Sequence, residues 1–405
     1  MKFIYLLLTC CLAFFAVSAE QVMEKNWRDK ALQDKAWQQY FARSAQLLAL
    51  DQQQLKAELK QLKLTTASKP IKAKQFGFLT DPPASYWASP EAVQVAKVIL
   101  SFQTPSGGWS KRTDMTRQVR QPGQLYGTEH DYIPTFDNDA TTTQIRWLSA
   151  FYPYADGQMQ PLLQSAVERG IAFIVQAQYP NGGFAQSYPL QGGYHDAITL
   201  NDNAMVQLLR LLRDVAQNTE FAFVAAPLKQ QAAQSFDLGV ELLLKAQLVL
   251  NGELTVWSAQ HHPLTLAAVK ARAYELASLV SSESAEVTLL LMQLPQPSAQ
   301  VIASVEAAVH WFAVHQIKDT LMQRSEQGVH FVKKSGAKPL WARFYDLEHQ
   351  QPLFVDRDGN RVASMADLSL ERQNGYGWYQ SNADSVLKAY PGWKKRVKAL
   401  TVVPE

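Results

Sequence analysis

Cysteine is almost absent from this sequence of 405 residues. Its two cysteines, Cys10 and Cys11, lie in an apolar N-terminal stretch that starts after Lys2 and ends in small residues at Ala19. A short positive start, an apolar run and a small-residue end are the pattern of a secretory signal peptide, which we assign to residues 1–19. The mature chain would then contain no cysteine, which excludes a disulfide, a thiolate metal site and a cysteine nucleophile.

Long apolar runs and an excess of one charge are also missing. After residue 19 no stretch is apolar enough to span a membrane. The chain has 39 basic and 36 acidic residues, a balance that gives no argument for nucleic acid as a partner. We therefore expect a secreted or periplasmic monomer that binds no nucleic acid and has no membrane span in the mature chain.

The N-terminal part of the mature chain predicts amphipathic helices. Residues 24–63 are rich in Gln, Lys, Ala and Leu, and the leucines recur at roughly helical spacing. We assign residues 20–66 to a helical extension with a structural role and residues 67–405 to the main domain. The turn-forming segment 64–70 is the expected joint between them.

The main domain is predicted to be mainly helical. Apolar residues recur with a helical period over 90–102, 140–152, 160–178, 202–217, 228–249 and 301–316. One loop between these segments, Gln103-Thr-Pro-Ser-Gly-Gly-Trp109, recurs as Gln178-Tyr-Pro-Asn-Gly-Gly-Phe184. A repeated unit of helix, Gly-Gly turn and helix predicts stacked helical hairpins that close into an α/α toroid, with loops gathered at one end. The alternative is that the Gly-Gly turns serve the architecture alone.

Strands are expected near the C-terminus. Residues 339–347 and 352–356 have strand character, and 357–360 form the expected turn that leads into 361–364. The segment 356–360 superficially resembles a calcium loop, but its glycine is misplaced for an EF-hand and no Glu closes it. The predicted fold class is therefore mainly α: an α/α toroid of helical hairpins with a small β-hairpin region near the C-terminus.

Two helix starts carry unusually many side-chain oxygens. Asp137-Asn138-Asp139 precedes one apolar helical run, and Asn201-Asp202-Asn203 precedes another. Such side chains cap helix N-termini, which is the simpler interpretation. They are also the ligands that Ca²⁺ prefers, and their recurrence beside repeated loops favours a calcium site. No HExxH or paired-cysteine motif argues for zinc.

A second group consists of arginines in aromatic and acidic settings. Guanidinium forks bind carboxylates through two hydrogen bonds, so several together could line a groove for a polyanion. A structural salt bridge is the alternative for each of them. The group comprises Arg272 in KARAYE, Arg343 in ARFY, Arg357 in DRDG and Arg372 in ERQNGYGWY. The adjacent His261 and His262 are a weaker signal, because neighbouring side chains point in different directions.

Six motifs then occur in a specific order. They are QTPSGGWSK, FDNDATTTQIRWL, QYPNGGFAQSYPLQGGYHDAITLNDNAMV, VWSAQHHPLTL with KARAYE, PLWARFYDL with PLFVDRDG, and ERQNGYGWY. In this order the chain resembles the pectate lyases of polysaccharide lyase family ten over roughly residues 75–395. The resemblance implies an α/α toroid that binds polygalacturonate or oligogalacturonides. It also implies calcium-assisted anti-β-elimination that gives unsaturated oligogalacturonides.

The resemblance implies roles for individual residues. The positions that match the calcium site are Asp137, Asn138 and Asp202. The position that matches the proposed catalytic base is Arg272. The positions that match the substrate-binding region are Arg343, Arg357 and Arg372, with Asn201 and Lys111 as further groove candidates. Because a free guanidinium has a pKa above about 12, an arginine base needs neighbouring cations that disfavour its charge, and we expect an alkaline optimum.

Some segments depart from the family pattern. The Gly-Gly loops read GGWSK and NGGFAQSYP, where the family has an additional Pro in each and a Trp in the second. The segment LASLVSSES after KARAYE replaces a loop that contains proline. Two alternative functions therefore stay open. One is a non-catalytic or weakly active periplasmic binder of pectic oligosaccharides. The other is an α/α-toroid glycoside hydrolase that acts on acidic oligosaccharides through two carboxylates, Asp137 and Asp202.

Overall fold

The structure is a computed structural model that describes residues 26–129 and 134–401. The signal peptide predicted over 1–19 lies outside the described residues. Within these ranges, no helix combines the length and the apolar character that a bilayer crossing requires.

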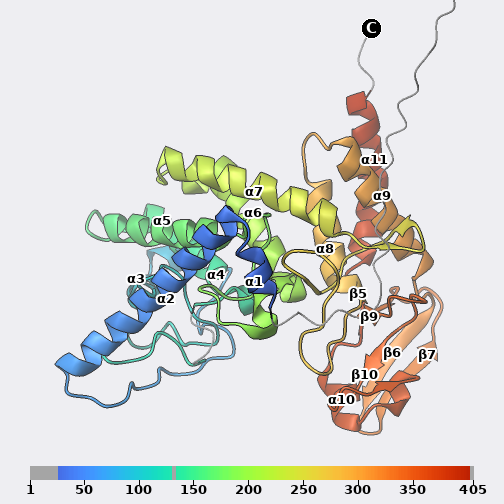
Figure 1. The fold of residues 1–405 in the computed structure, drawn as a ribbon, viewed down its shortest axis with the longest axis horizontal. Helices are drawn as coiled ribbons and strands as arrows, with labels where there is room; N and C mark the ends of the chain where they lie inside the picture. The colour runs from blue at the N-terminus through green and yellow to red at the C-terminus, as the bar shows by residue number, and fades with distance from the viewer. Residues whose placement is uncertain (1–25, 130–133, 402–405) are drawn as a thin grey trace, which may run out of the picture.

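Helices dominate the described chain, and the predicted mainly α fold class is confirmed (Figure 1). The helices are α1 (Trp27–Ala31), α2 (Lys35–Gln61), α3 (Pro90–Ser101), α4 (Thr142–Phe151), α5 (Met159–Ala177), α6 (Ala204–Gln217), α7 (Ala226–Ala246), α8 (Ser281–Met292), α9 (Ala299–Val314), α10 (Leu370–Gly375) and α11 (Asp384–Thr401). The six segments predicted from helical periodicity correspond to α3, α4, α5, α6, α7 and α9. Sequence analysis missed α8, which starts in the segment interpreted as a loop, and α11, which contains Pro391.

The helices form two layers. Consecutive helices pack as hairpins, α4 with α5, α6 with α7, and α8 with α9. The first members also contact one another, α4 with α6 and α6 with α8, and so do the second members, α5 with α7 and α7 with α9. This is the arrangement of an α/α toroid, with α4, α6 and α8 as its inner layer. The inner helix α6 accordingly buries eight of its residues, from Ala204 to Val215.

The repeated loops have a structural basis that extends to a third copy. The Gln103 side chain donates to Gly107 O within its own loop (2.8 Å) and to Ala166 O on α5 (2.9 Å). Gln178 repeats this pattern, and so does Gln247, which donates to Thr255 O (2.7 Å) and to Ser304 O on α9 (3.1 Å). Each glutamine therefore joins its loop to the next outer helix. The third copy escaped sequence analysis because its loop is longer and lacks the Gly-Gly pair.

Short antiparallel strand pairs complete the fold. The longest, β6 (Thr320–Ser325) with β7 (Gly328–Lys333), was not predicted, because its largely exposed residues show no alternation of apolar and polar side chains. The predicted turn at 357–360 is confirmed, since it joins β10 (Phe354–Val355) to β11 (Arg361–Val362). The other pairs are β1 (Ile198–Thr199) with β4 (Gln260–His261), β2 (Val249–Leu250) with β3 (Glu253–Leu254), β5 (Leu279–Val280) with β9 (Phe344–Tyr345), and β8 (Trp341–Ala342) with β12 (Tyr379–Gln380).

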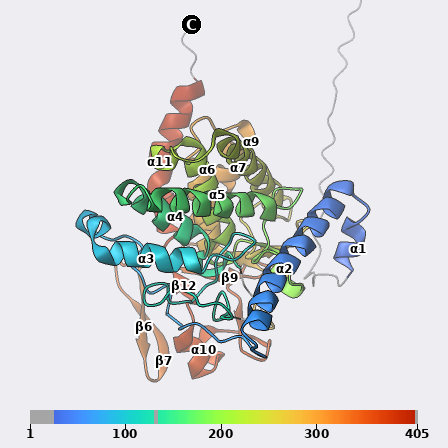
Figure 2. The same cartoon turned by 90° about the vertical axis from the view of Figure 1, so that its left-hand side faces the viewer.

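The N-terminal helices lie against the helical domain (Figure 2). Trp27, Trp37 and Tyr40 are buried and belong to the same hydrophobic cluster as the two helical layers. The boundary predicted at residue 66 stays a prediction, but α1 and α2 share their core with the domain that follows.

Candidate active site

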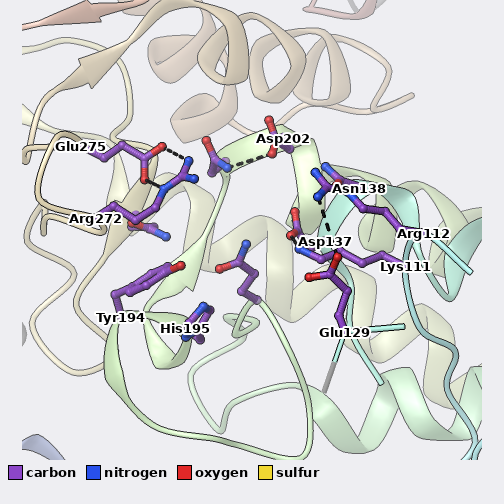
Figure 3. Close-up of a pocket in the computed structure, with 13 residues that line it drawn as sticks. Lys111, Arg112, Glu129, Asp137, Asn138, Tyr194, His195, Asp202, Arg272 and Glu275 are labelled. Atoms are coloured by element: carbon purple, nitrogen blue, oxygen red, sulfur yellow. Dashed lines mark hydrogen bonds and ion pairs between the residues drawn. The ribbon is translucent and has the colours of Figure 1, made fainter. Parts of the chain in front are cut away.

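A polar pocket lies where the inner helices begin (Figure 3). Its lining comes from five parts of the chain. They are the loop after α3, the start of α4, the loop after α5, the start of α6, and the segment from β4 onward. Of the sequence-predicted residues, the lining contains Lys111, Asp137, Asn138, Asn201, Asp202 and Arg272. Sequence analysis did not predict Arg112, Glu129, Gln186, His195, Gln260 and Glu275 in this site.

Both acidic helix starts adopt the same unusual backbone. Asp137–Asp139 and Asn201–Asn203 form short 3₁₀ turns that contact each other. Asn138 (φ 51°) and Asp202 (φ 52°) are both left-handed, a conformation that is costly for residues other than glycine and is enriched at functional sites. Neither turn provides the side-chain cap of the following helix, because Thr141 is the N-cap of α4 and Asn203 makes no capping bond at α6. The capping interpretation is therefore wrong for Asp137, Asn138 and Asp202.

The two carboxylates are held by cationic side chains. Asp137 forms an ion pair with the Lys111 ammonium, and both side chains are about nine-tenths buried. Asp202 lies 3.5 Å from Arg343, which also donates to Asn201 Oδ1 (3.1 Å). Burial raises the pKa of Asp202, although the neighbouring Arg343 lowers it. Each of these two carboxylates therefore has a cationic partner.

The oxygen donors of the two acidic helix starts suit calcium. Two carboxylates and one amide oxygen, from Asp137, Asp202 and Asn138, line the same pocket, and such oxygens are ligands for a hard cation. No group of three His, Cys, Asp or Glu side chains in the described ranges is placed to hold a metal. A cation at this site would therefore complete its coordination with amide or water oxygens, and would compete with Lys111 and Arg343 for the carboxylates.

Arg272 is held by an acidic neighbour. Its Nε donates to one Glu275 carboxylate oxygen (2.7 Å), and its Nη2 pairs with the other. The hydrogen bonds that Arg272 donates to Glu275 raise the pKa of Arg272 above its usual value, although burial opposes the shift. The shift is opposite to the one that a basic role requires, because Glu275 stabilises the charged guanidinium.

The ring of Tyr274 brings three of the predicted arginines together. The guanidinium carbon lies 4.9 Å from the ring centroid in Arg272, 5.0 Å in Arg357 and 4.7 Å in Arg372. These distances are typical of cation–π contacts. Arg357 is also paired with Glu371 at the surface (2.7 Å). Sequence analysis did not identify Tyr274 as the residue that joins these arginines.

A second aromatic ring connects Arg372 to Arg343. The Tyr376 centroid lies 3.9 Å from the guanidinium carbon of Arg372 and 5.0 Å from that of Arg343. Arg372 has no exposed surface, and neither of its terminal nitrogens has a hydrogen-bond partner among the described residues. Burial accordingly lowers the pKa of Arg372. Arg343, Arg357 and Arg372 lie beside the pocket, outside its lining residues, so contact between Arg372 and a substrate would require movement.

The start of α8 is a third acidic helix start that sequence analysis missed. Glu283 is buried there and pairs with Arg343 (3.1 Å). The Ser284 hydroxyl accepts from Trp257 N (3.0 Å), as the Thr141 hydroxyl accepts from Trp109 N at the start of α4 (3.0 Å). The sequence signal was present, because Ser-Ser-Glu-Ser precedes the apolar end of α8.

The adjacent histidines have structural partners. His261 is fully buried, and its Nε2 accepts from Ser258 N (3.1 Å). Burial lowers its pKa to about 4, so the ring is neutral at physiological pH. The Nδ1 of His262 accepts from the backbone N–H of Leu264 (3.1 Å). Both rings therefore fix the loop around β4.

Comparison with known proteins gives a consistent result. The family profile described as pectic acid lyase matches residues 103–387. The family 10 polysaccharide lyase from Cellvibrio cellulosa is similar in structure, with a TM-score of 0.67 and 34% identity over 77% of this chain and 97% of that one. An aspartate-to-alanine mutant of that lyase, in complex with trigalacturonic acid, gives a TM-score of 0.67 and 33% identity over 76% of this chain and 97% of that one. No curated protein matches the chain.

Proposed function

Since this chain belongs to the pectic acid lyase family and is a polysaccharide lyase, we propose that it cleaves polygalacturonate by calcium-assisted anti-β-elimination. The products are unsaturated oligogalacturonides. The observation that carries the proposal is the composition of one pocket. Arg272, the acidic residues Asp137 and Asp202, and the cations Lys111 and Arg112 come from separate segments and line it together.

The cationic residues bind the substrate. Polygalacturonate carries a carboxylate on every sugar, and Lys111, Arg112 and Arg272 provide positive charge in the pocket that can pair with these groups. Arg343 and Asn201 are joined by a hydrogen bond at the pocket edge and extend this surface. Arg357 and Arg372 contact the Tyr274 ring that Arg272 also contacts, and help to hold this group of cations in place. The substrate therefore lies between the acidic helix starts and the Arg272 side of the pocket.

Arg272 takes the proton from C5 of the galacturonate. As this C–H bond breaks, the electron pair forms the C4–C5 double bond, and the bond from C4 to the glycosidic oxygen breaks. The leaving oxygen gains a proton from water, so one new non-reducing end is unsaturated and the other product has a free hydroxyl. Calcium, held by Asp137, Asn138 and Asp202, would supply positive charge at the C6 carboxylate, where negative charge develops.

Glu275 controls when Arg272 can act. While both oxygens of Glu275 accept from Arg272, the guanidinium keeps its proton. Binding of a substrate carboxylate and a cation adds charges that compete for this pair. Alkaline pH is then needed to populate the neutral base.

The rest of the proposal concerns where the protein works. We place it outside the cytoplasm, in the periplasm or secreted, with residues 1–19 removed as a signal peptide. Residues 20–66 form the helical extension and 67–405 the catalytic toroid. The protein acts as a monomer on polygalacturonate or oligogalacturonides.

The test is an absorbance assay for the unsaturated product. Purified mature protein is incubated with polygalacturonate at alkaline pH, with added Ca²⁺ and separately with EGTA. We expect a calcium-dependent rise that falls by at least about a hundredfold in Arg272→Ala, the usual contribution of a general base. If the unmodified protein gives no absorbance rise but still binds polygalacturonate, the result would instead support the non-catalytic binder. A calcium-independent release of reducing ends without absorbance would support the hydrolase.

A further inference from the structure

The N-terminal helices contact the two Gly-Gly loops that flank the pocket. At one end, the Asp51 carboxylate of α2 accepts from the backbone N–H and the hydroxyl of Ser106, both at 2.7 Å, in the first Gly-Gly loop. Further along, Tyr40 donates to Ala177 O (3.1 Å), and its ring contacts that of Tyr179, which belongs to the second loop. One helix thus spans both copies of the repeat.

A partly buried ion pair links α1 to the pocket wall. Arg28 donates through Nε to Asp196 Oδ2 (3.0 Å), and its Nη2 pairs with the same oxygen. The Asp196 side chain is 1% exposed, whereas that of Arg28 is 39% exposed. The other Asp196 oxygen accepts from Gly192 N (3.0 Å). The carboxylate therefore closes the short turn 193–196 from inside, and the cation comes from the N-terminal segment.

The turn held in this way carries two residues of the pocket wall. The rings of Tyr194 and His195 are in contact, tilted by 35° with centroids 3.8 Å apart, and both residues line the pocket. The carbonyl of His195 accepts from Gln186 N (2.9 Å), and Gln186 also lines the pocket. Tyr194 lies on the same side of the pocket as Arg272 (Figure 3).

We infer that α1 and α2 are a positioning element of the active site, and that Arg28 fixes the Tyr194–His195 wall through Asp196. The reason is that the Asp196 carboxylate is buried, whereas the Arg28 side chain that neutralises it is partly exposed. Without Arg28, Asp196 would remain a buried carboxylate with backbone donors alone, an arrangement that favours opening of the turn or protonation. The aromatic contacts among Trp27, Trp37 and Tyr179, with centroids 5.0–6.2 Å apart, hold α1 close enough for the pair to form.

The chain offers a control ion pair near the C-terminal end of α2, away from α1. Arg120 pairs with Glu58 of α2 (2.5 Å), and both side chains are largely buried. Glu58 also accepts from Gly123 N (2.8 Å), as Asp196 accepts from Gly192 N. The chemistry is the same, but neither Arg120 nor Glu58 lines the pocket.

The experiment compares Arg28→Met, Arg28→Lys and Arg120→Met in the full mature chain. Amide hydrogen exchange followed by mass spectrometry measures opening of residues 186–197. We expect at least about tenfold faster exchange there in Arg28→Met, recovery of most protection in Arg28→Lys, and a local effect near Gly123 alone in Arg120→Met. This readout does not depend on the proposed function.

The kinetic readout rests on the proposed function. With polygalacturonate, Arg28→Met should raise KM by about fivefold or more with kcat changed less than about twofold, because the wall positions the sugar and transfers no proton. Arg120→Met should leave both constants unchanged. Unchanged exchange at 186–197 in Arg28→Met, or equal KM increases in Arg28→Met and Arg120→Met, would overturn the inference. Absent turnover in every variant, including the unmodified chain, would refute the proposed function and leave the exchange test valid.

Discussion

The Arg272–Glu275 pair provides a direct test of the proposed base. Replacing Glu275 by Gln keeps the shape of the side chain and removes its charge. The tight turn between the two residues is preserved, because Glu275 N donates to Arg272 O and Ala271 N donates to Glu275 O, both at 2.9 Å. The change therefore acts on the electrostatics of Arg272 more than on its position.

The expected effect follows from the charge at this distance. An opposite charge in hydrogen-bond contact shifts a pKa by about one to three units, and the exposure of Arg272 moves the expectation to the lower end. Glu275 stabilises protonated Arg272, so its removal lowers the pKa of Arg272 and increases the neutral fraction at each pH. The acid limb of the kcat/KM profile should therefore move to lower pH by roughly one unit.

The measurement is kcat/KM for polygalacturonate from neutral to alkaline pH at saturating Ca²⁺. Glu371→Gln is the control, because Glu371 holds Arg357 with the same two-bond geometry (3.1 and 2.7 Å) outside the pocket lining. That variant should keep the acid limb in place. An acid limb that stays fixed or moves to higher pH in Glu275→Gln would refute Arg272 as the base.

Two further predictions concern charge balance and stability. Lys111→Met removes the cation that competes for Asp137, so Ca²⁺ should bind about fivefold more tightly by isothermal titration calorimetry without substrate, a change of about 1 kcal/mol. Weaker or unchanged binding would contradict this competition. Burial raises the pKa of Asp51 from 3.8 to about 6. The folded state therefore gains stability from protonated Asp51 below pH 3.8, and it loses this contribution as the pH rises through about 6. Asp51→Asn should abolish that loss and raise the free energy of unfolding at pH 8 by about 1–3 kcal/mol, measured by urea unfolding, whereas a lower value at pH 8 would show that the charged form is needed at Ser106.

Local signals in the sequence predicted much of this structure. Apolar periodicity placed α3 to α7 and α9 within a few residues of their ends. The repeated Gly-Gly turns predicted the hairpins, because two glycines permit the close approach of a loop to the next helix. At Gly182, for example, a Cβ atom would lie 2.3 Å from Leu238 O, and the backbone there has φ +100°. The acidic helix starts could be predicted as part of one pocket because the Asp and Asn residues of each start are adjacent in the sequence.

Features that depend on tertiary contacts were not accessible in this way. The side chains of Glu275 and Tyr274 gain their roles from what they face, and sequence spacing does not show that one ring meets three guanidinium groups. Burial of Arg372 is equally invisible in a polar, glycine-containing segment. The helix α11 was missed because Pro391 lacks the N–H that a helix interior uses, and packing of α11 on α8 and α9 offsets that loss.

The left-handed residues at the helix starts have a consequence for engineering. A glycine at Asn138 or Asp202 would adopt φ near 50° without the steric cost, which is about 1 kcal/mol for a residue with a Cβ atom. A search for heat-tolerant variants would therefore favour glycine at both positions. Each such substitution would remove an oxygen from the pocket. If these oxygens hold calcium as proposed, selection for stability alone would reduce activity.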